Sequence, residues 1–227
     1  MSVRRLLVAT RSTGKMAEIR RILGSVSGLE LLDLDDAGIP PSPEEDALEP
    51  YETFEQNARS KAEHFHRISG LPTVADDSGI EVDALGGAPG VRSKRFAPIG
   101  AGAASPGGQD AANNAHLVER LKDVPAGART ARYVCVAVLL DGAAPPLVVR
   151  GEAEGIIVDQ PRGQGGFGYD PHVLLPGLDR TFAELTPDEK NARSHRGAAF
   201  RALADRLGDR WDPSLRRSGP TNGGPAA

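Results

Sequence analysis

Apolar and polar positions in the N-terminal part of the chain follow two different periods, which predict strands and a helix in turn. The runs "RRLLVAT" and "LELLDL" have the short, mostly apolar form of buried strands. Between them, residues 14–24 carry apolar side chains on one helical face, at Met16, Ile19 and Leu23. We therefore expect a strand–helix–strand unit, followed by an acidic, proline-rich loop over residues 35–50.

Helical periodicity returns twice before the middle of the chain. Residues 53–69 are predicted to form an amphipathic helix that ends at Gly70, because glycine readily adopts the left-handed backbone of a C-cap. Its apolar positions are Phe54, Ala58, Phe65 and Ile68. Residues 97–108 are predicted to be a mobile loop, and a helix over residues 109–124 follows it. The inward side chains of that helix are expected to be Ala115, Val118 and Leu121.

The second half of the chain begins with two long strand patterns and ends with helices. "TARYVCVAVLL" and "PLVVRGEAEGII" predict a hairpin around the turn "DGAAP". "TPDE" is a capping box in which Thr186 caps a helix and Pro187 takes its first position. A later apolar stripe that stops at Gly208 comprises Phe200, Leu203, Ala204 and Leu207. Because helices and strands alternate first and strands cluster later, we predict an α/β fold with a mixed sheet.

Composition indicates a globular protein without basic character. The 227 residues are 39% hydrophobic, so we assign residues 1–211 to one domain and expect the apolar-poor tail 212–227 to be disordered. The net charge of −4 argues against nucleic-acid and membrane-surface partners. No run approaches the roughly 18 apolar residues of a membrane helix, and the N-terminal run is too short for a secretory signal, so we expect a cytoplasmic protein. The single cysteine, Cys135, is expected to be a buried thiol on a strand.

Candidate chemistry starts with two adjacent carboxylates, Asp76 and Asp77, which directly follow the apolar run "TVA". Side chains alternate across a strand, so one carboxylate would face the core while the other points away. An ionised carboxylate near a core is costly unless a cation or hydrogen-bond donors meet it. Either the strand has ended in a turn at this point, or a positive group is expected there.

Two glycine-containing segments are candidates for ligand binding. "VATRSTGK" runs from a strand into a helix N-terminus beside Lys15, which suits an anion, although the first glycine of a P-loop is missing. The alternative is a solvated surface lysine. "GQGGFGYDPHVLLP" places Phe167 and Tyr169 among glycines, which suits stacking on a base. The alternative there is a tight turn whose aromatic rings fill the core.

A third segment, "EKNARSHRGAAF", gathers cationic side chains. On one continuous helix, Lys190 and Arg196 would point about 240° apart at about 100° per residue, and could hardly serve one ligand. Ser194 is a good N-cap, so we predict a break there and a second helix that begins at His195. The break would direct Lys190, His195 and Arg196 into one cleft.

Six motifs occur in a fixed order between Leu6 and Leu207, namely "VATRSTGK", "TFEQNARSKA", "ADDSGIEVDALGGAPGVRS", "GFGYDP", "TFAEL" and "EKNARSHR". In this set and order the chain resembles the inosine triphosphate pyrophosphatase family, also called the dITP/XTP pyrophosphatases. The resemblance implies an elongated α/β fold of two lobes around a long mixed sheet, with the active cleft between the lobes, and a homodimer. It also implies Mg²⁺-dependent hydrolysis of ITP, dITP and XTP to the monophosphate and pyrophosphate, which cleanses the nucleotide pool.

The same resemblance implies roles for individual residues. Asp77 would be the catalytic carboxylate and a magnesium ligand, with the adjacent Asp76 and Glu49 as further metal ligands. The carboxylates would then await Mg²⁺, a cation that takes oxygen ligands. The residues implied to bind the phosphates and the base are Thr10, Arg11, Ser12, Thr13, Gly14, Lys15, Ser78, Phe167, Gly168, Tyr169, Asp170, Lys190, His195 and Arg196.

Two residues depart from the family pattern. Ser12 stands where the family has asparagine and has a shorter reach, and Gln56 replaces a usual glutamate, which would weaken the charge near a metal. The segment before Gln56 also lacks its usual form, so Glu45 is an alternative to Glu49. Three other functions stay open: a nucleotide-binding sensor without catalysis, a pyrophosphatase of similar fold for other modified nucleotides, and an acidic loop that is merely solvated.

Overall fold

A single mixed sheet of seven strands forms the centre of the computed structural model, which describes residues 3–104, 107–142 and 145–211. The strands are β1 (Arg4–Val8), β2 (Leu29–Leu32), β3 (Thr73–Val82), β4 (Thr130–Leu140), β5 (Leu147–Ile157), β6 (Val173–Leu175) and β7 (Arg180–Thr181). Their order in the sheet is β2–β1–β3–β4–β5–β6–β7. β1 pairs in parallel with β2 and β3, and the other pairs are antiparallel, which confirms the predicted mixed sheet and hairpin.

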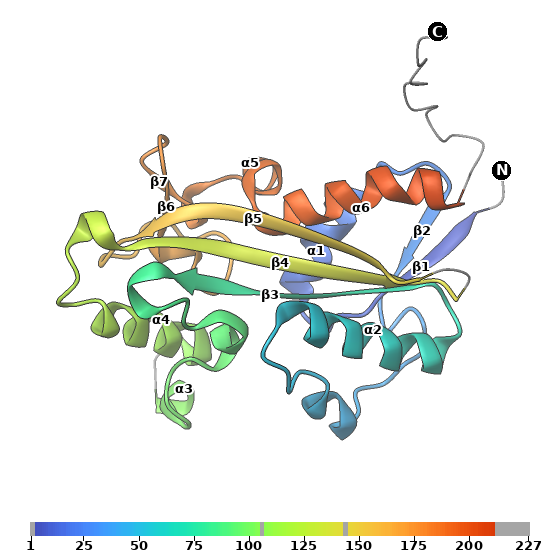
Figure 1. The fold of residues 1–227 in the computed structure, drawn as a ribbon, viewed down its shortest axis with the longest axis horizontal. Coiled ribbons are helices and arrows are strands. Elements are labelled where there is room, and N and C mark those ends of the chain that lie inside the picture. Colours follow the sequence, from blue (N-terminus) through green and yellow to red (C-terminus); the bar gives the residue numbers. More distant parts are fainter. Residues whose placement is uncertain (1–2, 105–106, 143–144, 212–227) are drawn as a thin grey trace, which may run out of the picture.

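Helices cover both faces of this sheet (Figure 1). The α-helices are α1 (Thr13–Leu23), α2 (Phe54–Ser69), α3 (Ala101–Ala104), α4 (Gly108–Arg120), α5 (Pro187–Arg193) and α6 (His195–Trp211). Short 3₁₀ turns are η1 (Pro43–Ala47), η2 (Asp83–Leu85), η3 (Gly90–Arg95), η4 (Ala126–Ala128), η5 (Asp170–His172) and η6 (Phe182–Glu184). α1, α5 and α6 lie on one face and α2, α3 and α4 on the other, while β3, β4 and β5 run along the length of the molecule.

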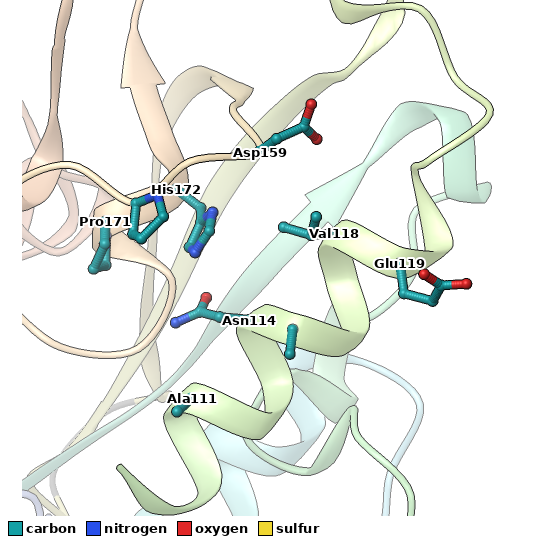
Figure 2. Close-up of a pocket in the computed structure, with 9 residues that line it drawn as sticks. Ala111, Asn114, Val118, Glu119, Asp159, Pro171 and His172 are labelled. Atoms are coloured by element: carbon teal, nitrogen blue, oxygen red, sulfur yellow. The ribbon is translucent and has the colours of Figure 1, made fainter. Parts of the chain in front are cut away.

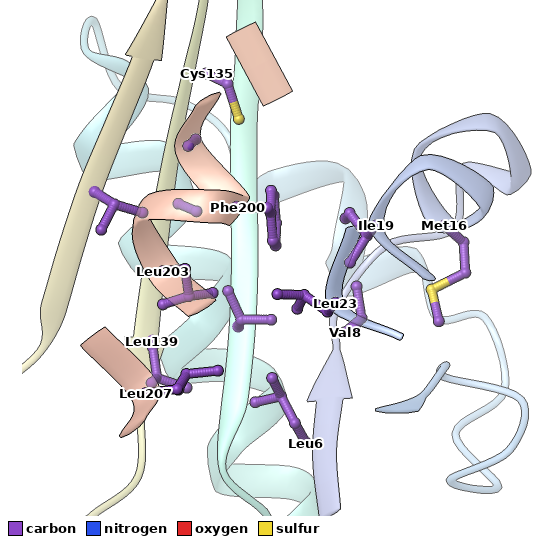
Figure 3. Packing of buried hydrophobic residues seen from close by; sticks show 14 residues of the cluster. Leu6, Val8, Met16, Ile19, Leu23, Cys135, Leu139, Phe200, Leu203 and Leu207 are labelled. Atoms are coloured by element: carbon purple, nitrogen blue, oxygen red, sulfur yellow. The ribbon is translucent and has the colours of Figure 1, made fainter. Parts of the chain in front are cut away.

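The largest apolar cluster joins the sheet to α1 and α6 (Figure 3). The predicted faces of both helices meet there, with Ile19 and Leu23 of α1 packed near Phe200 and Leu203 of α6. Each of these four side chains is fully buried, and each contributes about 1.5–3 kcal/mol of transfer free energy. This cluster therefore fixes the start of α6 against the end of the sheet that carries α1.

β3 continues through the aspartate pair instead of ending before it. Asp76 pairs with Ala137 and Asp77 with Val136, and the ladder runs on to Val82. The first alternative from the sequence, a turn at these residues, is therefore wrong. Both carboxylates project from a central strand that is hydrogen-bonded on both sides near Val74.

The helix α4 buries a different face from the one that the sequence predicts. α4 begins at Gly108 and ends at Arg120; Leu117 and the following Leu121 are buried, whereas Ala115 is exposed. The reason is Asn113, whose buried amide accepts a hydrogen bond from the backbone N–H of Ala97 at 2.9 Å and donates to two carbonyls of η3. Because Asn113 is buried to make these hydrogen bonds, the inward face of α4 is rotated from the face that apolar positions alone would predict.

Smaller differences concern element ends. Ile68, expected on the buried face of α2, is half exposed, while the left-handed cap at Gly70 is confirmed. The expected loop over 97–108 contains α3, and α6 passes through Gly208 to Trp211. The acidic loop over 35–50 contains η1. The predicted disordered tail, residues 212–227, lies outside the described residues.

We expect Gly151→Ala to destabilise the fold. A Cβ at Gly151 on β5 would lie 2.2 Å from the carbonyl oxygen of His195 and 2.4 Å from the backbone nitrogen of Ala199, so α6 would have to shift. Overpacking of this kind costs about 1–3 kcal/mol. Gly208→Ala is the matched control, because Gly208 is helical with open space around it, and should stabilise by about 0.5–1 kcal/mol. Urea unfolding measures both; equal effects would contradict the close α6–β5 packing.

Candidate active site

Asp76 is a buried carboxylate held by cations. Its Oδ2 lies 3.1 Å from Nζ of Lys15 on α1 and 3.4 Å from Nη2 of Arg196 on α6. The Cys135 thiol, buried as predicted, is 3.7 Å from the same oxygen. Burial raises the pKa of Asp76, but the charges of Lys15, Arg196 and Lys61 outweigh burial and hold the pKa well below its ordinary value. Asp76 is therefore a fixed anion that joins three elements of the fold.

Asp77 is also buried but has no cationic partner in ion-pair contact among the described residues. Its Oδ2 accepts a hydrogen bond from Nδ2 of Asn57 at 3.0 Å, and its Oδ1 accepts from the backbone N–H of Ser78 at 2.9 Å. Burial raises its pKa above the ordinary value, and the nearby charges of Lys61 and Lys15 do not cancel that effect. Asp77 thus keeps unused acceptor capacity and some affinity for a proton or a cation.

Lys61 connects Glu49 to the aspartate pair. Its Nζ pairs with the Glu49 carboxylate and donates to the backbone carbonyl of Asp76 at 2.6 Å. Burial raises the pKa of Glu49, but the charge of Lys61 more than offsets it and the pKa lies below its ordinary value. The alternative, Glu45, instead bonds Arg11 and forms a capping box with Ser42 at the start of η1. The structure therefore brings Glu49 toward the aspartates and engages Glu45 elsewhere.

The predicted phosphate segment forms an ordinary helix start. Ser12 is the N-cap of α1 and accepts from the backbone N–H of Lys15 at 3.3 Å, while Oγ1 of Thr10 accepts from the backbone N–H of Ser12 at 3.2 Å. Thr13 is exposed as the first residue of α1. The guanidinium of Arg11 is engaged by Glu45 at 2.8 Å and is turned toward the acidic loop. Within this segment, the backbone N–H groups in the first turn of α1 are therefore the groups that can bind an anion.

The break at Ser194 is confirmed. Ser194 has φ −75° and ψ 155°, which is extended backbone, and separates α5 from α6. Its Oγ accepts a hydrogen bond from the backbone N–H of Gly197 at 3.0 Å, as an N-cap should. The capping box of Thr186 and Glu189 is likewise present at the start of α5.

Because of this break, Lys190 and Arg196 converge on one carboxylate, that of Glu18 on α1. Nζ of Lys190 is 2.7 Å from one Glu18 oxygen and Nη1 of Arg196 is 2.6 Å from the other. Arg196 also donates to Oγ of Ser78 at 2.7 Å, so Ser78 lies beside these cations. The sequence analysis missed Glu18 and Lys61. Glu18 lies three residues after Lys15, and Lys61 four after Asn57, and both spacings are signals for a shared helix face.

His195 is buried and neutral beside these cations. Its ring stacks on Tyr133 with centroids 4.7 Å apart and planes at 12°. Burial, together with the charges of Arg196 and Lys190, lowers the pKa of His195 well below its ordinary value. Its Nδ1 is buried and has no hydrogen-bond partner. A neutral imidazole with a free nitrogen can recognise a polar edge of a ligand.

The two aromatic residues of "GFGYDP" have different roles. Phe167 is 37% exposed, and its ring lies 4.4 Å from Nζ of Lys190 and 5.7 Å from the guanidinium carbon of Arg196. Tyr169 is 5% exposed and donates through its hydroxyl to the carbonyl of Ser93 at 2.7 Å, so its ring fills the core. The core-filling alternative from the sequence therefore describes Tyr169, so its predicted contact with the base is wrong, whereas the ring of Phe167 is partly exposed beside two cations.

Asp170 completes this segment as a buried acceptor. Its Oδ2 accepts from Nζ of Lys190 at 2.6 Å and from the backbone N–H of Phe167 at 2.9 Å, and its Oδ1 accepts from the hydroxyl of Tyr133 at 3.1 Å. Asp170 therefore orients Lys190 and the loop that carries Phe167.

Comparison with known proteins identifies the family of this chain. The model of the Ham1 family matches residues 6–206. The chain belongs to the Ham1 family. The dITP/XTP pyrophosphatase of Ralstonia nicotianae is 47% identical over 207 residues, which cover 90% of this chain and 97% of the relative. The dITP/XTP pyrophosphatase of Mycobacterium tuberculosis is 47% identical over 208 residues, which cover 90% of this chain and 96% of that relative.

Solved structures of Ham1 proteins share the fold. A HAM1 protein from Coxiella burnetii has a TM-score of 0.77 at 36% identity and covers 91% of this chain and 99% of its own. A nucleoside-triphosphatase / dITP/XTP pyrophosphatase from Mycobacterium abscessus has a TM-score of 0.65 at 44% identity. The match covers 89% of this chain and 98% of that protein's chain. The mixed sheet with flanking helices is therefore the fold of this Ham1 chain.

In this Ham1 chain the two departures from the family pattern have local roles. Ser12 caps α1, as described above. Gln56 lies in the first turn of α2, where its Oε1 accepts from the hydroxyl of Thr53 at 2.9 Å. Gln56 is exposed, and its side chain completes the start of the helix.

A magnesium ion fits two carboxylates of this Ham1 chain. Within residues 3–104, 107–142 and 145–211, no group of three or more His, Cys, Asp or Glu side chains is arranged to hold a metal. Mg²⁺ usually takes only one or two carboxylates, however, together with waters and substrate phosphates. Asp77 suits this role because its oxygens are hard ligands and no ion pair engages it among the described residues, whereas Glu49 would have to exchange its pairing with Lys61 for the metal. Asp76 is already engaged by Lys15 and Arg196.

We expect Asp76→Asn to lower the free energy of unfolding at pH 7 by about 3 kcal/mol, because it leaves Lys15 and Arg196 without their shared anion. The folded-state pKa of Asp76 is lowered, so this stability is present above about pH 4 and is lost as the pH falls through the folded-state pKa. Urea unfolding of both proteins should give a constant difference above about pH 5 and a smaller one near pH 3. A difference that grows toward acid would contradict the ion pairs.

Proposed function

We propose that this protein hydrolyses non-standard purine nucleoside triphosphates, namely ITP, dITP and XTP, to the monophosphate and pyrophosphate with the help of Mg²⁺. The reaction would remove these nucleotides from the precursor pool. The observation that carries the proposal is Asp77, a buried carboxylate with no ion-pair partner among the described residues, next to an anion that is held by Lys15 and Arg196. The Ham1 relatives named dITP/XTP pyrophosphatase support the same reaction.

The phosphates would bind at the start of α1. The backbone N–H groups of Thr13 and Gly14, in the first turn of α1, carry a partial positive charge, and Lys15 adds a full charge. Mg²⁺ held by Asp77 and Glu49 would supply further neutralisation of phosphate charge. Asp77 would orient a water molecule and accept its proton. Positioning and charge neutralisation supply most of the rate in phosphoryl-type reactions.

The base would bind beside Phe167 and the cations that its ring contacts. Phe167 is half exposed and offers a face for stacking, whereas Lys190, His195 and Arg196 are buried and carry polar N–H groups or nitrogens. A 6-keto purine presents an acceptor where adenine presents a donor. Donors at this position would therefore favour hypoxanthine and xanthine over adenine.

Partners and location extend the same proposal. A homodimer is the assembly that the family resemblance implies, and a net charge of −4 does not favour nucleic acid as a partner. No helix among the described residues is long and apolar enough to cross a membrane. We propose that the protein works as a cytoplasmic homodimer on free nucleotides.

The parent protein should release pyrophosphate from ITP, dITP and XTP with Mg²⁺ and much more slowly from ATP. Binding adenine would leave a buried donor unpaired, which costs about 1–3 kcal/mol, or roughly 5- to 150-fold in kcat/KM for each contact. A pyrophosphate-release assay across a nucleotide panel, with and without EDTA, measures this. Comparable kcat/KM for ATP and ITP would overturn the base assignment, and binding without turnover would favour a sensor.

Asp77→Asn should lower pyrophosphate release by at least about 10²-fold while nucleotide affinity changes little, because the amide keeps the shape of the carboxylate but can neither accept a proton nor hold Mg²⁺. Asp76→Asn should instead weaken nucleotide binding, because Lys15 loses its fixed partner. Turnover and affinity must be measured separately for both variants. Turnover of ITP by Asp77→Asn within a few-fold of the parent would refute the catalytic assignment.

A further inference from the structure

The loop that carries Phe167 is attached to α4 on both sides of Gly168. The backbone N–H of Gly168 donates to Oδ2 of Asp110 at 2.9 Å, and Nδ2 of Asn114 donates to the carbonyl of Gly168 at 3.0 Å. Asp110 and Asn114 lie four residues apart on α4, a spacing that places both on one face. α4 therefore holds two successive peptide units of the loop.

This attachment matters because the glycines on either side of Phe167 do not restrict the backbone by themselves. Gly168 has φ +64° and Gly166 has φ +73°, in the left-handed region where glycine has unusual freedom. Phe167 lies between these two glycines, and its own N–H is held by Asp170. The hydrogen bonds from α4 restrict rotation at Gly168 and so restrict the position of the Phe167 ring.

The Phe167 ring has little space in which to move. A Cβ at Gly14 would lie only 2.9 Å from the Phe167 ring, so the ring rests against the backbone at the start of α1. The same ring contacts Lys190 and Arg196 from the other segment of the site. A modest rotation at Gly168 would move the ring away from the phosphate end and the cations together.

At its position, the side chain of Asn114 lowers the stability of the fold unless its amide group makes a useful hydrogen bond. Its Oδ1 is buried and has no hydrogen-bond partner, and its one side-chain hydrogen bond within the described residues is the bond to Gly168. Figure 2 shows Asn114 directed from α4 toward Pro171 and His172, at the edge of a hollow of about 490 Å³. An unpaired buried oxygen costs free energy, so an apolar side chain of similar shape would serve stability at least as well.

We propose that Asp110 and Asn114 are positioning residues that hold Gly168, keep the Phe167 ring over Lys190 and Arg196, and thereby set the selectivity for 6-keto over 6-amino purines. The inference rests on the proposed function and adds a selectivity device outside the residues that touch the substrate. It predicts that the two residues affect KM and base selectivity more than kcat, because neither reaches the aspartate pair.

Four variants test this inference. Asp110→Ala removes the acceptor for the Gly168 N–H, whereas Asp110→Asn keeps an acceptor oxygen. Asn114→Leu removes the donor together with the unpaired oxygen at nearly constant shape. Glu119→Gln is the matched control on the same helix, because Glu119 is exposed and pairs only with Lys122 among the described residues.

The ratio of kcat/KM for ITP to that for ATP should fall about 3- to 10-fold in Asp110→Ala and in Asn114→Leu, mainly through KM for ITP. Asp110→Asn should restore the parent ratio to within about 2-fold, and Glu119→Gln should match the parent. Asn114→Leu should unfold at the same urea concentration as the parent or a higher one, which separates positioning from a structural role. Unchanged ratios in both loss variants, or an equal fall in Glu119→Gln, would overturn the inference.

Amide hydrogen exchange of the nucleotide-free protein tests the attachment without any activity. The segment over 165–170 should exchange faster in Asp110→Ala and Asn114→Leu than in Asp110→Asn or the parent. If the parent turns over no nucleotide, the proposed function fails and the selectivity role fails with it. If the parent prefers ITP but exchange and selectivity are both unchanged in the variants, only the positioning role is wrong.

Discussion

Compensation of the buried charge of Arg196 is the constraint on which the site depends. The side chain is fully buried, and a buried cation is tolerated only when it is paired and hydrogen-bonded. Its partners are Glu18 on α1 and Asp76 and Ser78 on β3, while Arg196 itself belongs to the first turn of α6. That turn packs closely on β5 at Gly151. The elements α1, β3, β5 and α6 must therefore pack together before the buried charges are compensated.

The same compensation separates two adjacent aspartates into different roles. Asp76 meets Lys15 and Arg196, and its pKa is lowered; Asp77 faces the amide of Asn57 without a paired cation, and its pKa is raised. Neighbouring carboxylates whose environments move their pKa values apart are typical of catalytic sites. One aspartate thereby maintains the site, and the other is available for chemistry. Strand alternation makes this division possible, because it directs successive side chains to opposite faces, where they meet different partners.

Local signals predicted much of the fold because capping and periodicity act within a few residues. The break at Ser194 and the long hairpin are examples. Prediction failed where tertiary contacts decide. The face of α4 is set by the buried amide of Asn113, and Tyr169 fills the core although its neighbour Phe167 is exposed. Glu18 was missed because a helical glutamate near a lysine looks solvated until α5 and α6 place two more cations against it.

The central claim is that Asp77, and not Asp76, is the carboxylate reserved for the metal. A crystal structure with Mn²⁺ in place of Mg²⁺ and a non-hydrolysable α,β-methylene analogue of ITP tests it most directly, because anomalous scattering locates the metal. The account predicts a metal at about 2.1 Å from an Asp77 oxygen, with Asp76 still bonded to Lys15 and Arg196. A metal coordinated by Asp76, with Asp77 outside its coordination shell, would contradict the account.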